Sequence, residues 1–390
     1  MLTIALWSTY EVFNKQLFHV EKFSWLSDVT AKMFLELKKY ANQCGVNIDT
    51  VNYLDISSVD AFLFYEMPGL DNHYLNYALN NNKPVFLYAT EPESVHWGRE
   101  NYCVSRHKCF KKVFTWNDLL VDGKKYIKTA VGSFDFPKSI NKKHPDEKKL
   151  CAIIASNKNS NHSLELYSKR KEAIRWFEAN HPEEFDLYGQ LWDGREYPSF
   201  RGPIDSKKAV LENYRFSICY ENARDMPGYI TEKIFDSMFA GCIPVYWGAD
   251  NISDYIPGEC YIDKTQYSNY EELYNYIKNI GADEYQRRLQ HIENYLNSPQ
   301  IEVYTNDYFA RTIIDTIVDN IGAVEDVGSG GNPGWWLYYA REARTWTDLN
   351  KAIDVFNKAL LVMFEKHRLE WYLEVRGYLT QAYIKIGGVK

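Results

Sequence analysis

Hydrophobic and polar positions alternate along the first part of the chain between short apolar runs and amphipathic stretches. The apolar runs at residues 2–7, 60–65 and 84–88 have the length of buried strands, and residues 27–44 have the periodicity of a helix that ends at Gly45. Strands that alternate with helices in this way are typical of parallel sheets. The pattern therefore predicts an α/β lobe at the start of the chain.

The same alternation begins again after a polar, lysine-rich stretch at residues 138–149. The elements expected there are strands at 150–155, 185–188, 215–220 and 243–247 and helices at about 163–179 and 229–240. We interpret the lysine-rich stretch as a solvated domain boundary, with weak attraction to anionic membranes as the alternative. Two Rossmann-like, doubly wound lobes follow from this pattern.

Beyond residue 271 the pattern becomes helical through 319, and a glycine-rich stretch at 328–334 predicts a flexible linker. Ala352, Phe356 and Ala359 have the spacing of the second helix of a tetratricopeptide repeat. We therefore divide the chain into an amino-terminal lobe, a carboxyl-terminal lobe, a linker and a helical, tetratricopeptide-like tail. The predicted ranges are 1–145, 146–321, 322–334 and 335–390.

Composition narrows the function classes. Hydrophobic residues make up 45% and charged residues 25%, which excludes a disordered chain, and the formal net charge of -7 disfavours nucleic-acid binding. No window approaches the roughly 20 apolar residues of a membrane span, and the first residues lack the basic start of a signal peptide. We expect a cytoplasmic protein with at most peripheral membrane contact.

Cysteine and histidine usage gives no sign of a metal. The seven cysteines are scattered, with no Cys-x-x-Cys pair, and none of the nine histidines has zinc-ligand spacing to another ligand. We interpret the cysteines as reduced core thiols.

The stretch from 220 to 248 carries the most chemistry, because it runs strand, polar loop, helix and strand. Pro227 and Gly228 turn the chain and Thr231 is placed to cap the helix, so the helix start is predicted to bind a diphosphate. Lys233 in the first turn opposes the helix dipole, and a visiting anion would compensate for that cost.

Several polar residues converge on this strand end and helix start. They are Glu221, Asn222, Arg224, Tyr229, Glu232 and Lys233. Each alone is as well explained by a solvated surface pair, but open α/β sheets bind ligands at the carboxyl edge of their strands. The convergence therefore favours a ligand site.

This segment strongly resembles the signature of the α1,3/4-fucosyltransferases, which transfer fucose from GDP-fucose. The resemblance rests on Glu221 and Asn222, on Tyr-Ile-Thr-Glu-Lys-Ile at 229–234 and on Ala-Gly-Cys-Ile-Pro-Val-Tyr-Trp-Gly at 240–248. A looser likeness covers most of residues 1–320 and none of the tail.

The resemblance implies a GT-B architecture with an acceptor domain, a donor domain and an inverting transfer in the cleft between them. Carried over by position, the implied donor-binding residues are Ser156, Asn157, Arg170, Glu221, Asn222, Tyr229, Thr231, Glu232 and Lys233. Lys169 is the alternative to Arg170 as the diphosphate-contacting cation. Arg and Lys suit a pyrophosphate that gains charge as the sugar leaves.

The resemblance also implies a glutamate base in the first lobe, after the strand at 84–88. Glu93 is the first candidate and Glu91 the second, although either could be an ordinary loop carboxylate. The chain contains no Asp-x-Asp, the motif with which many sugar-nucleotide transferases hold a divalent ion. We expect no essential metal and no cofactor, with GDP-fucose as a substrate.

The implied activity is transfer of L-fucose from GDP-fucose to a hydroxyl of an N-acetylglucosamine- or glucose-containing glycan, with α1,3 linkage expected first. The alternatives are a GT-B transferase that uses another GDP-sugar and a non-catalytic helical-repeat adaptor. The tail also suggests self-association.

Overall fold

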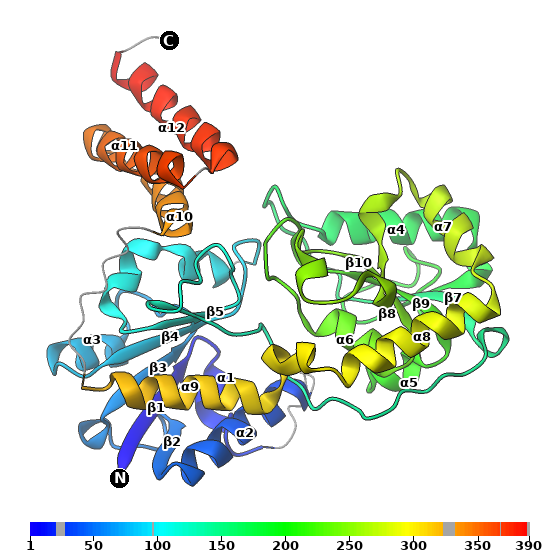
Figure 1. The fold of residues 1–390 in the computed structure, drawn as a ribbon, viewed down its shortest axis with the longest axis horizontal. Coiled ribbons are helices and arrows are strands. Elements are labelled where there is room, and N and C mark those ends of the chain that lie inside the picture. The colour runs from blue at the N-terminus through cyan, green and yellow to red at the C-terminus, as the bar shows by residue number, and fades with distance from the viewer. Residues whose placement is uncertain (21–27, 96, 323–331, 367, 388–390) are drawn as a thin grey trace. The chain divides into compact units, whose positions relative to one another are not determined.

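The computed structural model describes residues 1–20, 28–95, 97–322, 332–366 and 368–387. These residues form two compact units. The first comprises 1–93, 97–129 and 310–390, and the second comprises 94–96 and 130–309. Figure 1 shows a sheet flanked by helices in each of them.

The first unit is built on six parallel strands in the order β2-β1-β3-β4-β5-β6. The strands are β1 (Leu2–Ser8), β2 (Val46–Thr50), β3 (Ala61–Tyr65), β4 (Val85–Ala89), β5 (Val113–Thr115) and β6 (Tyr126–Lys128). Helices α1 (Glu11–Gln16), α2 (Asp28–Gln43), α3 (His73–Asn80) and most of α9 (Asn306–Asn320) belong to the same unit. Every residue of β3 and β4 is buried, because helices cover both faces of a doubly wound sheet.

The second unit has a five-stranded parallel sheet in the order β11-β10-β9-β7-β8. Its strands are β7 (Lys149–Ile154), β8 (Phe185–Tyr188), β9 (Tyr214–Tyr220), β10 (Ile243–Trp247) and β11 (Ile262–Asp263). Its helices are α4 (Tyr167–Asn180), α5 (Lys207–Leu211), α6 (Glu232–Phe239), α7 (Tyr270–Asn279) and α8 (Ala282–Leu296). The predicted α/β alternation is confirmed, although sequence patterns missed β2, β5, β6 and β11.

Each sheet reverses its strand order once. In the first unit β1 lies between β2 and β3, and in the second unit β7 lies between β8 and β9. The connections leave in opposite directions at these points, between β1 and β3 and between β7 and β9, and the strand ends at such a reversal are where open α/β sheets bind ligands. We call these two places the switch points.

The two units divide the chain differently from the predicted ranges. Residues 130–145 belong to the second unit, because Phe134 N donates to Tyr304 O at 2.8 Å and Lys142 pairs with Glu293. The lysine-rich stretch is therefore packed on this unit rather than solvated throughout. Lys148, for example, is buried and donates from Nζ to the carbonyl of Gly241 at 2.7 Å.

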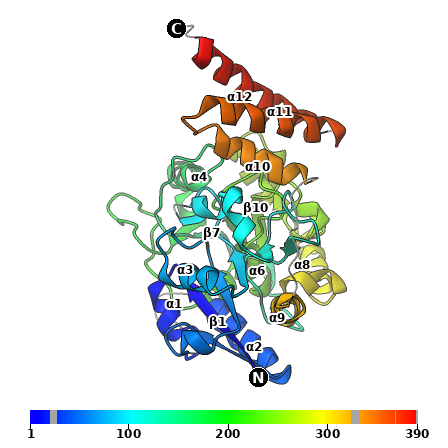
Figure 2. The ribbon, with the colours of Figure 1, turned by 90° about the vertical axis from the view of Figure 1, so that its left-hand side faces the viewer.

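The tail has three helices, α10 (Pro333–Ala343), α11 (Leu349–Glu365) and α12 (Leu369–Gly387). Figures 1 and 2 show α10 on the side that faces the first unit's sheet, with α11 and α12 beyond it. The predicted linker at 322–334 lies mostly outside the described residues. Its end, at Asn332, accepts hydrogen bonds from Gly334 N and Trp335 N and caps α10.

Helix α10 packs as part of the first unit rather than as a separate tail. Asn117 Nδ2 donates to Tyr338 Oη at 2.8 Å in a buried position, and the rings of Tyr102 and Tyr338 lie 5.0 Å apart. A Cβ on Gly334 would overlap with the carbonyl of Leu119. The tetratricopeptide-like character of the tail stays a prediction. No helix among the described residues is both long and apolar enough to span a bilayer.

The close approach of Gly334 to Leu119 predicts opposite effects for two Gly→Ala changes. Gly334→Ala should lower the free energy of unfolding of the first unit by about 1–3 kcal/mol, because the added methyl forces α10 away. Gly377→Ala, in open space on α12, should raise it by about 0.5–1 kcal/mol through helix propensity. Denaturant unfolding followed by tryptophan fluorescence measures both. Equal effects of the two changes would contradict the docking.

Candidate functional site

The switch point of the second unit is organised by the carboxylate of Glu221, which follows β9. This side chain has no exposed surface. It accepts from Thr231 N at 2.8 Å and from Thr231 Oγ1 at 2.7 Å, so it ties the end of β9 to the start of α6. Thr231 in turn caps α6, as predicted, by accepting from the backbone N–H of Lys233. A buried carboxylate thus fixes the start of the helix that was expected to face a diphosphate.

Lys233 completes this arrangement. Its ammonium lies 3.1 Å from Glu221 Oε2 and 2.9 Å from Thr231 Oγ1. Burial opposes its charge, but Glu221 and Glu232 outweigh burial and raise the pKa of Lys233. The cation in the first turn of α6 is therefore stabilised by an internal carboxylate, which was not foreseen. An ammonium has three N–H donors, so one remains for a further acceptor.

Arg170 comes from the first turn of α4 and reaches the same strand end. Its Nε and Nη2 donate to Tyr220 O at 3.1 and 2.8 Å, and Nη2 donates to Asn222 Oδ1 at 3.0 Å. Only 5% of the residue is exposed. Burial lowers the pKa of Arg170, while the neighbouring Glu221 opposes that shift. The Nη1 group makes no hydrogen bond to the described part of the chain, so it can donate to a ligand. Lys169, the alternative cation, instead pairs with Glu172 on the surface.

Glu232, the first residue of α6, belongs to a second ionic group, which includes Lys207 and Asp236. Its Oε1 lies 3.7 Å from Lys207 Nζ and 3.7 Å from Lys233 Nζ, and Lys207 also binds Asp236 at 2.6 Å. Burial would raise the pKa of Glu232, but the two lysines outweigh it and hold that pKa at about 2. Neither Lys207 nor Asp236 was predicted. Lys207 is on α5, outside the stretch with the family signature, whereas Asp236 is on α6, between the two motifs that carry the resemblance.

The remaining predicted donor residues lie at the ends of the same two strands or at the start of α6. Asn222 Nδ2 donates to Tyr229 Oη at 3.2 Å, and Tyr229 is buried. Ser156 and Asn157 follow β7, the other strand of the switch point, and Asn157 Oδ1 is buried without a hydrogen-bond partner in the described part of the chain. The structure therefore places all nine predicted donor residues at the β7–β9 switch point or on the helices that begin there.

The two candidate bases lie in different surroundings. Glu91 follows β4 and accepts from Tyr10 Oη at 3.2 Å, so it faces the residues after β1. Glu93 instead faces the tail. Burial raises the pKa of Tyr338, and the negative charge of Glu93 adds to that shift. Glu93 also contributes to raising the pKa of Arg341, whose main partner is Glu374.

The switch point of the first unit contains a further carboxylate, Glu66, that sequence reasoning missed. It directly follows β3, has a φ of 68° and is 1% exposed. Burial raises the pKa of Glu66 to about 7, with a further contribution from Glu91. Its position after a fully apolar strand was the available signal, since ligand-site residues favour strand carboxyl ends.

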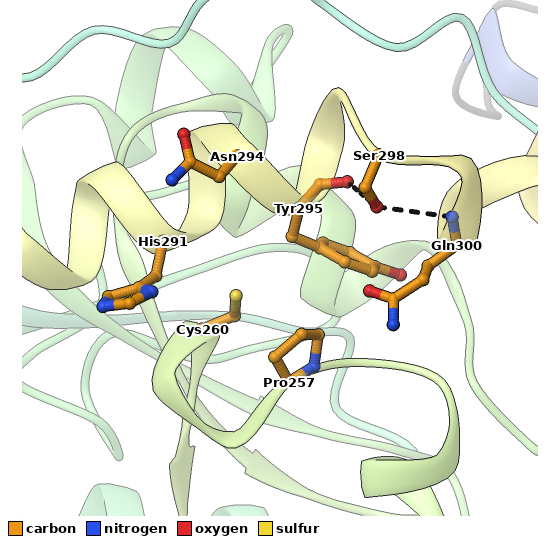
Figure 3. A pocket seen from close by; sticks show the side chains of 7 residues that line it. All are labelled: Pro257, Cys260, His291, Asn294, Tyr295, Ser298 and Gln300. Atoms are coloured by element: carbon orange, nitrogen blue, oxygen red, sulfur yellow. Dashed lines mark hydrogen bonds between the residues drawn. The ribbon is translucent and has the colours of Figure 1, made fainter.

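One hollow in the second unit contains none of the predicted residues. Figure 3 shows it between α8 and the turn before β11. Its volume is about 210 Å³. Its lining is Pro257, Cys260, His291, Asn294, Tyr295, Ser298 and Gln300. Among the described residues, no group of three or more His, Cys, Asp or Glu side chains is placed to hold a metal ion.

Comparisons with known proteins agree with the signature. Residues 144–303 match the family model described as glycosyltransferase family 10 (fucosyltransferase) C-term. An α-(1,4)-fucosyltransferase of Arabidopsis thaliana is 33% identical over 79 residues, 20% of either chain. The α-(1,3)-fucosyltransferase FucT of Helicobacter pylori is 30% identical over 101 residues, 26% of this chain and 21% of that protein.

The matched stretches thus span about a fifth of the length of these curated relatives. The likeness in fold extends further. A solved α1,3-fucosyltransferase superposes with a TM-score of 0.51 at 16% identity, over 83% of this chain and 91% of that one. The two parallel sheets are therefore those of a GT-B fold. With the signature at the β7–β9 switch point, residues 144–303 resemble the carboxyl-terminal domain of the fucosyltransferases of glycosyltransferase family 10.

Proposed function

We propose that this protein transfers L-fucose from GDP-fucose to a hydroxyl of an N-acetylglucosamine- or glucose-containing glycan, with inversion at the fucose carbon and α1,3 linkage. The observation that carries the proposal is the cationic switch point of the second unit. Arg170 and Lys233 each keep an N–H donor there, inside the stretch that matches the family model. An α1,3-fucosyltransferase of the same fold has been solved with GDP, which supports the choice of nucleotide.

In the proposed reaction the residues of the second unit bind the diphosphate and stabilise its departure. The acceptor hydroxyl loses its proton to a glutamate of the first unit as its oxygen bonds to the fucose carbon. The bond from that carbon to the diphosphate oxygen breaks in the same step, its electron pair stays on the diphosphate, and GDP leaves. Arg170 and Lys233 donate to oxygens that gain negative charge in this step, which is where fixed donors contribute most. The buried Glu221 holds Lys233 and the helix start in place beforehand.

The experiment that tests this function is incubation with GDP-fucose and a panel of acceptor glycans, followed by linkage analysis of the product. Thermal stabilisation by GDP but not by UDP should accompany transfer, since a ligand that binds the folded state raises the melting temperature of the protein. Transfer from a different GDP-sugar in place of GDP-fucose would support the alternative donor. Absence of both transfer and GDP stabilisation would refute the proposal.

The first prediction from the proposed function concerns the base, for which we favour Glu91 over Glu93. Glu91 faces the switch point through Tyr10, whereas Glu93 acts on residues of α10. Glu91→Gln should reduce turnover by about 10²–10⁴-fold and leave GDP binding unchanged, because only proton abstraction is lost. Glu93→Gln is the matched control and should retain most turnover. Steady-state kinetics and calorimetric GDP titration measure both variants. An inactive Glu93→Gln together with an active Glu91→Gln would contradict the prediction and indicate that Glu93 is the base.

The second prediction concerns the diphosphate-binding cation. Lys233→Ala should weaken GDP binding by about 10–100-fold, because a charge-assisted hydrogen bond contributes about 1.5–3 kcal/mol. Lys149→Ala is the matched control. Lys149 also pairs with a buried carboxylate, Asp186, at 2.9 Å, but at the amino end of β7. Calorimetric titration with GDP should find the control within twofold of the wild type. Equal losses in both variants would indicate a general electrostatic effect rather than a site.

The third prediction follows from the missing Asp-x-Asp. If protein cations neutralise the diphosphate, transfer should continue in excess chelator at close to the untreated rate. Product formation with and without chelator measures this. Complete inactivation that manganese reverses would contradict a metal-independent mechanism.

A further inference from the structure

The switch point of the first unit contains a buried carboxylate that the proposed reaction does not use. Glu66 leaves β3 with a φ of 68°, a left-handed conformation that is costly for a residue with a side chain. Such strain persists only where the surroundings hold the residue, and it is concentrated at functional sites.

The carboxylate of Glu66 collects hydrogen bonds from the loop after β4. It accepts from Thr90 N at 3.2 Å, from Glu91 N at 3.2 Å and from the Thr90 hydroxyl. Asn101 Nδ2 donates to its other oxygen and also to Glu91 O at 3.1 Å. Both backbone groups of Glu91 are thus held, one by Glu66 and one by Asn101.

The same contacts extend to the strand end itself. Asn101 Oδ1 accepts from Met67 N at 2.8 Å, so the turn after β3 and the loop after β4 are joined through one amide. Trp116 Nε1 donates to Thr90 O at 2.7 Å from beyond β5. The side chain of Glu91 leaves this fixed loop toward Tyr10.

We propose that Glu66 is a positioning residue for the transfer reaction, which fixes the loop at 90–91 and thereby aims the Glu91 carboxylate. This inference rests on the proposed function and on Glu91 as the base. It requires Glu66 to be ionised, because its neighbours in the loop present N–H and O–H donors and only the carboxylate accepts from all of them.

Several ionisable groups face Glu66 from the elements around it. They are Glu91 after β4, Tyr10 at the start of α1, Tyr65 of β3, Tyr88 of β4 and Tyr102 at the end of the segment Trp97–Tyr102. These are a second carboxylate and four phenols. Burial, and after it the negative charge of Glu91, raise the pKa of Glu66 to about 7, although hydrogen bonds from Thr90 and Asn101 act to lower it. Glu66 is therefore ionised above about pH 7, and the loop should loosen as the pH falls through that value.

The test compares Glu66→Gln with the wild type in two measurements. The first is hydrogen exchange of the amides of Thr90 and Glu91. In the wild type their protection should fall as the pH decreases through about 7, and in Glu66→Gln it should be low at every pH. The second is kcat, which we expect to drop by about 10²-fold in Glu66→Gln, the effect of a small misplacement of a catalytic group, with GDP affinity within twofold.

Two further variants separate positioning from folding. Asp60→Asn is the matched control. Asp60 directly precedes β3 and accepts from Thr3 N at 2.8 Å, so it lies at the amino end of the strand that Glu66 follows. It should keep the wild-type kcat and the wild-type protection of the 90–91 loop. Glu66→Asp retains the charge and should recover part of the kcat lost in Glu66→Gln.

The outcomes distinguish this inference from the proposed function. Wild-type protein that transfers no sugar would overturn the proposed function, while the exchange measurement would still test whether Glu66 holds the loop. Active wild type with an equally active Glu66→Gln would overturn only the positioning role. Loss of kcat in Glu66→Gln with unchanged protection at 90–91 would also overturn it, because Glu66 would then act by another route.

Discussion

The structure depends on one constraint, the single reversal of strand order in each parallel sheet. Helices that leave in opposite directions from β1 and β3, and from β7 and β9, cannot cover the strand ends between them. Backbone and side-chain polar groups at those ends must find partners inside the protein or in a ligand. The predicted donor residues gather at the second of these places, and Glu66, Glu91 and Tyr10 gather at the first.

Both switch points use a buried carboxylate that immediately follows a strand, but the electrostatic surroundings differ. Glu221 follows β9 and pairs with Lys233, so the two charges balance each other and the ammonium of Lys233 is held at the switch point. Glu66 follows β3 and meets a second carboxylate and several phenols, so its own ionisation is costly. This difference fits the proposed roles. A diphosphate requires fixed positive charge, whereas removal of a proton from a neutral hydroxyl requires an oriented carboxylate.

The family match covers only one of the two units that the structure describes. The family match comprises residues 144–303, which lie entirely in the second unit, where the signature and the cations are found. The first unit carries Glu91, Glu66 and the docked helix α10, and the matched stretch includes none of them. The contacts of Tyr338 with Asn117 and Tyr102 make the tail part of that unit.

The sequence alone determined the α/β class and most strands of the two sheets, and it located the predicted donor residues between 220 and 233 at a strand end and a helix start, because strand periodicity and the signature are local properties of the chain. The strand 185–188 was predicted at its observed bounds, and Thr231 was correctly expected to cap α6. Short strands such as β5 and β6 were missed, since three residues carry no periodicity.

Only the tertiary structure decided which polar groups meet. Lys233 and Glu221 are twelve residues apart, Glu66 and Asn101 thirty-five, and Asn117 and Tyr338 more than two hundred. The division of the chain was decided in the same way. The pattern of residues 138–149 predicts a solvated domain boundary, yet Lys142 and Lys148 have partners on α8 and after α6. Hydrogen bonds and burial depend on distance in space, and the pattern of residue types along the chain does not contain that distance.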